Sequence, residues 1–195
     1  MVFDRKVQLL HLAHPAENRW EWVEEKTMWA HMEQQNKTNL FSRVGLGVKT
    51  VLFTLRKTTE ISLAAALSHK GRHYFITDIN TDDPVLMTVT TADIQPVDCM
   101  VTREKEAEGS DKSSVMVPDA VLQFPACLTE KYVGYTQQEP MAQTTVTYVL
   151  VTPKPVELET NDLVAIAGRG NFRVQVAHLL DDHKNEYEIT KVEDV

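Results

Sequence analysis

Cysteines and long apolar runs are scarce in this chain, and each scarcity excludes a class of protein. The 195 residues include only two cysteines, Cys99 and Cys127, too few for a disulfide framework or a four-ligand zinc site. We expect both to be buried thiols. No stretch approaches the roughly 20 apolar residues of a membrane-spanning helix, and the N-terminal apolar run is too short for a secretory signal. The composition indicates a soluble globular protein, with the cytosol of its host as the default compartment.

Catalytic and cofactor-binding motifs are also missing. The sequence "GLG" at 45–47 is followed neither by the glycine-lysine-serine/threonine of a phosphate-binding loop nor by the rest of a dinucleotide fingerprint. No serine-hydrolase elbow or zinc-protease motif occurs. The calcium-like "DINTDD" at 78–83 has Asp83 where a glycine belongs, so we expect a turn that caps its own backbone. We therefore expect no catalytic residue, cofactor or metal, although an enzyme with a scattered site stays open as an alternative.

Positive charge is scarce overall, but it is concentrated in one region. The net charge is −8, which argues against a surface that grips duplex DNA through many phosphate contacts. Between Lys37 and Arg72, however, seven residues are basic and only Glu60 is acidic. This excess either marks a functional segment or lies on a solvated face.

Short β-strand patterns dominate what is present. Apolar, β-branched and aromatic residues alternate with polar ones between turn residues, as strands require. In "TVLFTLR", Val51, Phe53 and Leu55 are expected on one buried face. A short helical turn is expected within 58–67, before a strand. The predicted strands are residues 7–12, 26–32, 50–56, 73–79, 85–91, 146–151, 163–167, 172–180 and 186–192.

The chain divides into two predicted β domains, residues 1–97 and 98–195. The charged segment "TREKEAEGSDKSS" at 102–114 is expected to be a linker or an exposed hairpin tip. Residues 60–83 match 159–182 without a gap at an offset of 99, which makes the second domain a candidate duplicate of the first. Lys70 and Gly71 are a predicted hairpin turn, and Arg169 and Gly170 are the equivalent turn.

Trp20 and Trp22 have the alternate spacing that places two side chains on one face of a strand. Such a pair suits packing in a barrel. It also suits the stacking of bases on a single-strand nucleic-acid-binding β-barrel, with Lys37 and Arg43 as phosphate ligands. That function is the main alternative from another class.

The first 97 residues resemble the head-closure proteins of long-tailed bacteriophages, also called head-tail joining or stopper proteins. The resemblance covers the strand "VQLLHL", the segment "WEWVEEKTMWAHMEQQ", the loop "NKTNLFSRVGLGV", the strand "TVLFTLRKT" and the arm "KGRHYFITDI". Its most specific pieces are "TMWAHME", "FTLR" and "GRHYFI". About a hundred further residues lie outside the resemblance, so the role of the second domain does not follow from it.

The resemblance implies an SH3-like small β-barrel that forms a homo-oligomeric ring beneath the portal and adaptor of a virion, after assembly in the bacterial cytoplasm. The ring would close the head channel, retain packaged double-stranded DNA and dock the tail terminator or tail tube. A tail-terminator role in the same particle is an alternative. The family's channel loop corresponds to residues 36–49, and the residues expected to line the channel or contact DNA are Lys37, Asn39, Arg43, Gly45, Gly47 and Lys49.

Overall fold

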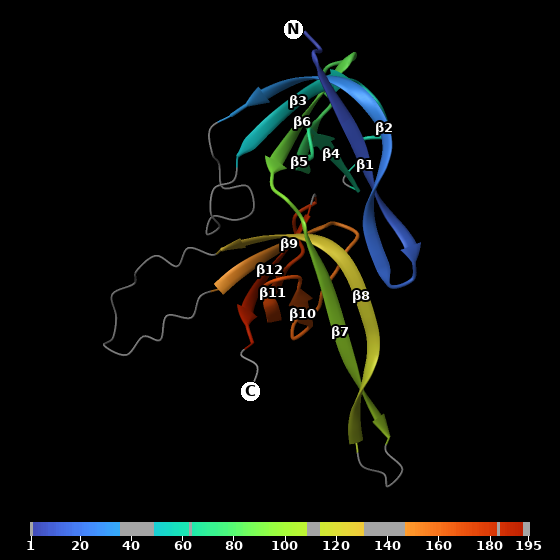
Figure 1. The fold of residues 1–195 in the computed structure, drawn as a ribbon, viewed down its shortest axis with the longest axis vertical. Coiled ribbons are helices and arrows are strands. Elements are labelled where there is room, and N and C mark those ends of the chain that lie inside the picture. The colour runs from blue at the N-terminus through green and yellow to red at the C-terminus, as the bar shows by residue number, and fades with distance from the viewer. Residues whose placement is uncertain are drawn as a thin grey trace, which may run out of the picture.

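The computed structural model describes residues 2–35, 49–62, 64–108, 114–130, 147–182 and 184–192, and these contain twelve strands and no helix. The mainly β prediction is therefore confirmed. The strands form two barrels, stacked along the long axis of the molecule (Figure 1). The first uses β1 (Arg5–Ala16), β2 (Arg19–Gln34), β3 (Thr50–Arg56), β4 (Ala65–His69), β5 (Arg72–Asn80) and β6 (Leu86–Asp93). The second uses β7 (Val97–Glu108), β8 (Ser114–Glu130), β9 (Thr147–Pro153), β10 (Leu163–Ile166), β11 (Gly170–His178) and β12 (Lys184–Lys191).

The first barrel is closed and entirely antiparallel. Its strands follow the order β1-β4-β5-β6-β3-β2, and a further pairing of β1 with β2 completes the circuit. Strand β3 matches the predicted residues, and its alternation holds because Val51, Phe53 and Leu55 are each at most 2% exposed. Because the circuit closes, each of the six described strands has a neighbour on both sides along part of its length, and none is the edge strand of an open sheet, which is the usual site of edge-to-edge aggregation. The prediction of a small barrel is confirmed, and the narrower SH3-like description stays a prediction.

The second barrel repeats the circuit of the first. Its order is β8-β7-β10-β11-β12-β9, and a pairing of β8 with β9 closes it. Each strand therefore has the same neighbours as the strand six places earlier. The duplication considered from the sequence is present as a repeat of topology.

The register of the strands repeats as well. Strands β5 and β6 correspond to β11 and β12 at an offset of 98, and β3 and β4 correspond to β9 and β10 at an offset of about 97. A β-bulge interrupts both copies at the same place, at Thr77 in β5 and at Gln175 in β11. Bulges are specific features of a fold, so their coincidence supports an internal duplication. The gapless offset of 99 was wrong by one or two residues.

The two predicted hairpin turns differ in detail. Lys70 and Gly71 form a two-residue turn, with φ values of 52° and 74°. In the second barrel the turn holds three residues, 167–169, where Arg169 N donates to Ile166 O, and Gly170 is already the first residue of β11. The additional residue explains why the offset increases from 97 to 98 between β4 and β5. The short helical turn expected within 58–67 was also wrong, since the described residues there form bends, a turn and the start of β4.

The charged segment 102–114 belongs largely to a long hairpin of the second barrel. Strand β7 pairs with β8 from Val97↔Ala126 out to Glu108↔Ser114, and the far ends of both strands extend away from the barrel (Figure 1). The passage between barrels is instead the short connection from Asp93, at the end of β6, to Val97.

The barrels share an apolar interface. Phe75 on β5 and Ala92 on β6 pack in one buried cluster with Cys127, Val149 and Val151 of the second barrel. Phe75 is 4% exposed and the two valines at most 3%. In addition, Leu12 of β1 packs in the core cluster of the second barrel, and Asn18 O accepts a hydrogen bond from Gln123 N at 2.8 Å. The barrels are therefore joined by buried side chains as well as by the chain connection.

Candidate functional site

The predicted channel loop connects β2 to β3, and the structure fixes both of its ends. Gln35 N donates to Thr50 O at 2.9 Å, which continues the β2–β3 ladder to the point where the loop begins. Lys49 O accepts a hydrogen bond from Asp93 N at 3.0 Å, while the Lys49 side chain is exposed. The other predicted loop residues, Lys37, Asn39, Arg43, Gly45 and Gly47, lie outside the described residues.

The second barrel has its corresponding connection on the same side of the molecule. In Figure 1 the end of β2 and the start of β3 lie on the left of the upper barrel, and the end of β8 and the start of β9 lie on the left of the lower barrel. The sequences of the two connections differ. Residues 36–49 contain three basic and no acidic residues, whereas 131–146 contain one of each. Only the first connection is basic.

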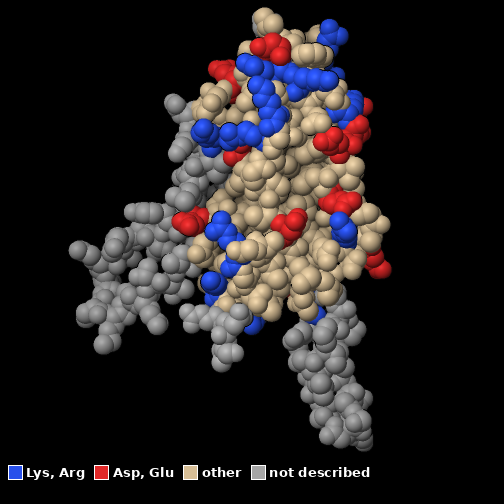
Figure 2. All heavy atoms as spheres, in the orientation of Figure 1, with Lys and Arg blue, Asp and Glu red and all other residues tan. Residues whose placement is uncertain are grey.

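The two halves of the chain also differ in net charge, and the first half is again the more positive. Residues 1–97 contain 11 basic and 11 acidic residues, whereas residues 98–195 contain 9 and 17, so the net charge of −8 belongs entirely to the second half. Figure 2 shows positive side chains gathered over the upper end of the first barrel. The middle of this face is mostly uncharged, with scattered pairs of opposite sign.

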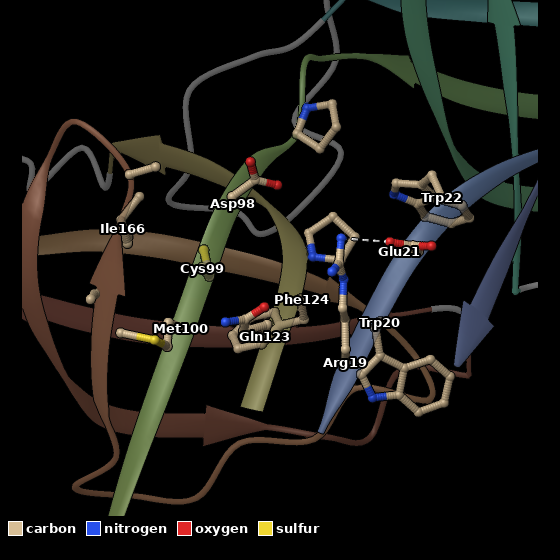
Figure 3. A pocket seen from close by; sticks show the side chains of 14 residues that line it. Arg19, Trp20, Glu21, Trp22, Asp98, Cys99, Met100, Gln123, Phe124 and Ile166 are labelled. Carbon is tan, nitrogen blue, oxygen red and sulfur yellow. Dashed lines mark ion pairs between the residues drawn. The ribbon is translucent and has the colours of Figure 1, made fainter. Parts of the chain in front are cut away.

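A pocket of about 670 Å³ lies between the barrels (Figure 3). Strand β2 contributes Trp20 and Trp22 from one side, while β7, β8 and β10 contribute residues from the other. Its charged lining residues are Asp98 and the Arg19–Glu21 ion pair, at 2.8 Å. The pocket is therefore largely apolar and slightly acidic. The pocket was not predicted from the sequence, although the spacing of Trp20 and Trp22 did indicate that these two lining residues share one face of a strand.

The two tryptophans share a strand face as predicted, but both have aromatic partners within the protein. Trp20 stacks on His14 with ring centroids 4.2 Å apart, and Trp22 is tilted against His73 at 5.3 Å. Both indoles also pack against the core of the second barrel. Packing of the barrels therefore occupies much of the ring surface that base stacking would use.

His73 is a buried ionisable group beside this interface. His73 is 6% exposed, and its Nε2 has no hydrogen-bond partner among the described residues. Burial lowers the pKa of His73 from its usual 6.5 to about 4. The imidazole is consequently neutral at pH 7, and protonating it would place an unpaired charge against Trp22.

This burial predicts a specific loss of stability in acid. An unfolded chain protonates His73 near pH 6.5, whereas the folded chain does not until about pH 4. Stability from this residue is thus complete above pH 6.5 and falls as the pH drops toward 4, by about 3 kcal/mol in total. Urea unfolding of the wild type and of His73→Phe at several pH values measures this loss. The free energy of unfolding should fall less steeply toward low pH in the variant than in the wild type. Parallel pH profiles would contradict the assignment.

The cysteines and the acidic turn have structural roles. Both cysteines are free and buried, as predicted, and burial raises the pKa of the Cys99 thiol to about 12 and raises the pKa of Cys127 as well. Neither is a thiolate at neutral pH. Asp83 Oδ1 accepts hydrogen bonds from Val85 N and Leu86 N at 2.8 Å, so this turn does cap its own backbone. In the described part of the chain, no group of three or more histidine, cysteine or acidic side chains is placed to hold a metal ion.

No protein-family model matches the chain, and no curated protein sequence matches it. Among the described residues, no helix has the length and apolar character needed to cross a bilayer. The likeness to head-closure proteins therefore depends on the motifs of residues 1–97 alone.

Proposed function

We propose that the protein is a non-enzymatic structural component of the neck of a long-tailed bacteriophage or prophage. It forms a homo-oligomeric ring that closes the head channel, retains packaged DNA and docks the tail. The observation that carries the proposal is the basic connection between β2 and β3, which is anchored at Gln35 and Thr50 on the wall of a rigid closed barrel.

The charge distribution suits a channel through which DNA must both pass and be held. An acidic body makes few phosphate contacts, so DNA can slide past it without being trapped. Three basic residues on a loop hold a DNA end only locally, and the glycines at 45 and 47 permit backbone angles that other residues avoid. Weak contacts are sufficient when rotational symmetry repeats them around an axis.

In this proposal the first barrel contributes the channel loop, and the second barrel enlarges the surface available to neighbouring components. The apolar interface centred on Phe75 holds the second barrel to the first, so forces on one barrel reach the other. The expected partners are further copies of the chain, the portal and adaptor, and the tail terminator or tail tube.

Localisation in the particle tests the proposal. A chain tagged in the phage and labelled with nanogold should place the label at the head-tail junction of purified particles. A label on the capsid shell, along the tail or absent from particles would overturn the proposal. A particle lacking the chain, made by interrupting the gene, controls for adventitious labelling.

A further inference from the structure

A second pocket, of about 590 Å³, lies on the first barrel itself. It is formed by the N-terminal segment, the middle of β2 and the end of β3, and its lining residues are Phe3, Lys26, Met28, Trp29, Leu55, Arg56, Lys57 and Thr58. It combines an apolar floor with three cations and an indole. Met28 and Trp29 belong to the motif "TMWAHME" and Leu55 and Arg56 to "FTLR", but neither the resemblance nor the proposed channel loop gives these residues a role.

Trp29 is the exposed aromatic residue of this pocket. It is 60% exposed, and no aromatic ring stacks on it among the described residues. Trp20 and Trp22, by contrast, are packed between the barrels. Because Trp29 lies on a paired strand, its backbone is already ordered. A ligand that stacks on the indole therefore loses less binding free energy to conformational entropy.

The cations around Trp29 differ in how far they are neutralised. Lys26 forms an ion pair with Glu60. Lys57 Nζ donates to two backbone carbonyls, Thr81 O at 2.7 Å and Asp83 O at 3.3 Å, and this fixes its position beside the pocket. Hydrogen bonds from backbone N–H groups lower the pKa of the Asp83 carboxyl, and the charge of Lys57 lowers it further, so Lys57 is partly neutralised. Arg56 is exposed and pairs with no acidic side chain in the described part of the chain. The pocket therefore presents an excess of positive charge next to a free aromatic face.

These features select among anionic ligands. An acidic protein segment would supply carboxylates to Arg56 and Lys57 but would leave the flat face of Trp29 without a matching surface. A nucleotide supplies both a phosphate and a planar base, separated by one sugar. Base stacking on an aromatic residue beside a cationic groove is the usual mode of single-strand recognition without sequence preference.

We propose that the Trp29 pocket binds single-stranded nucleic acid, with a base stacked on Trp29 and adjacent phosphates bound by Arg56 and Lys57. This inference places a nucleic-acid site away from Trp20 and Trp22, which the sequence suggested. It does not depend on the proposed ring, because one subunit contains all of the pocket.

Fluorescence anisotropy with a labelled ten-nucleotide oligothymidine tests the proposal. The wild type should bind at low salt with an affinity that falls as salt increases. Trp29→Ala should weaken binding by at least about tenfold, and Trp29→Phe should retain most of it, because a ring remains. Arg56→Ala should lower the slope of log K against log salt by about 0.7, as expected for one lost phosphate contact.

Matched controls separate this pocket from other basic surfaces. Lys191→Ala removes an exposed cation from the second barrel and should leave binding unchanged. Circular dichroism should show all variants folded, because Trp29 and Arg56 are exposed. Equal affinities of wild type and Trp29→Ala, or no binding at low salt, would overturn the proposal. Competition by poly-glutamate as strong as that by oligothymidine would also overturn it, and would assign the pocket to an acidic protein partner.

Discussion

Replacing Phe75 with alanine is expected to lower the free energy of unfolding by about 3–5 kcal/mol and to separate the unfolding of the two barrels. Phe75 lies in the cluster that joins β5 and β6 to β8 and β9, and it is its largest side chain. Removing the ring leaves a cavity at the contact between the barrels. All three tryptophans lie on β2, and Trp20 and Trp22 also pack against the core of the second barrel. Tryptophan fluorescence therefore reports on the first barrel and on its contact with the second, whereas far-UV circular dichroism reports on the strands of both barrels.

Urea titrations followed by these two signals provide the measurement. For the wild type the two curves should coincide, as for a single cooperative unit. For Phe75→Ala they should separate. Phe172→Ala is the matched control, because it removes the same side chain from the core of the second barrel, and it should lower stability while the curves stay together. Separate curves for the wild type, or coincident curves for Phe75→Ala, would contradict a shared core.

Neutralising the proposed channel loop is expected to have the largest effect on function. In a phage that carries Lys37→Gln, Arg43→Gln and Lys49→Gln together, heads should be packaged but most should then lose their DNA. The physical reason is that each substitution removes a cation from every copy in the proposed ring, so the loss is multiplied by its symmetry. DNase-protected DNA per particle, measured by quantitative PCR, gives the retained fraction.

The control for this experiment carries the same charge change elsewhere. Arg169→Gln, Arg173→Gln and Lys191→Gln remove three exposed cations from the second barrel, and their particles should retain DNA as the wild type does. Equal retention in both triple variants would show that the loop charges do not hold the DNA.

The strands and their inward faces could largely be predicted from the sequence, because local alternation decides them. Strand β3 is the clearest case, since the apolar Val51, Phe53 and Leu55 recur at every second position and Thr54 and Arg56 lie on the opposite face. The hairpin at Lys70 and Gly71 was equally accessible, because glycine after a short apolar strand has a direct conformational meaning. These are local features, and local signals were sufficient for them.

The interface between the barrels could not be predicted in the same way. In "HYFI" at 73–76, Tyr74 and Ile76 face the first core while Phe75 faces the second barrel, so all four residues are buried. A continuous buried run does indicate that both faces are covered, but it does not name the covering element. The charged segment 102–114 was predicted to be a linker or an exposed hairpin tip, and the pairing of β7 with β8 shows the hairpin. The length of its strands was not predicted, because this pairing requires no alternation of apolar residues.

The candidate sites likewise combine features that are visible in the local sequence with contacts that only the fold creates. The basic excess from Lys37 to Arg72 was visible in the sequence, yet the grouping of Arg56 and Lys57 around Trp29 depends on β2 and β3 being neighbours. The spacing of Trp20 and Trp22 gave their common face correctly. His14 reaches Trp20 across the β1–β2 hairpin, whereas His73 lies on β5, which only the closed barrel brings to Trp22.

A cryo-EM reconstruction of the head-tail junction tests the central claim most directly. The claim predicts a closed ring of this chain at the junction, with Lys49 and the start of β3 turned toward the central axis and the connection from β2 lining the channel. A ring in which Lys49 faces outward, or a junction that contains no copy of the chain, would contradict it.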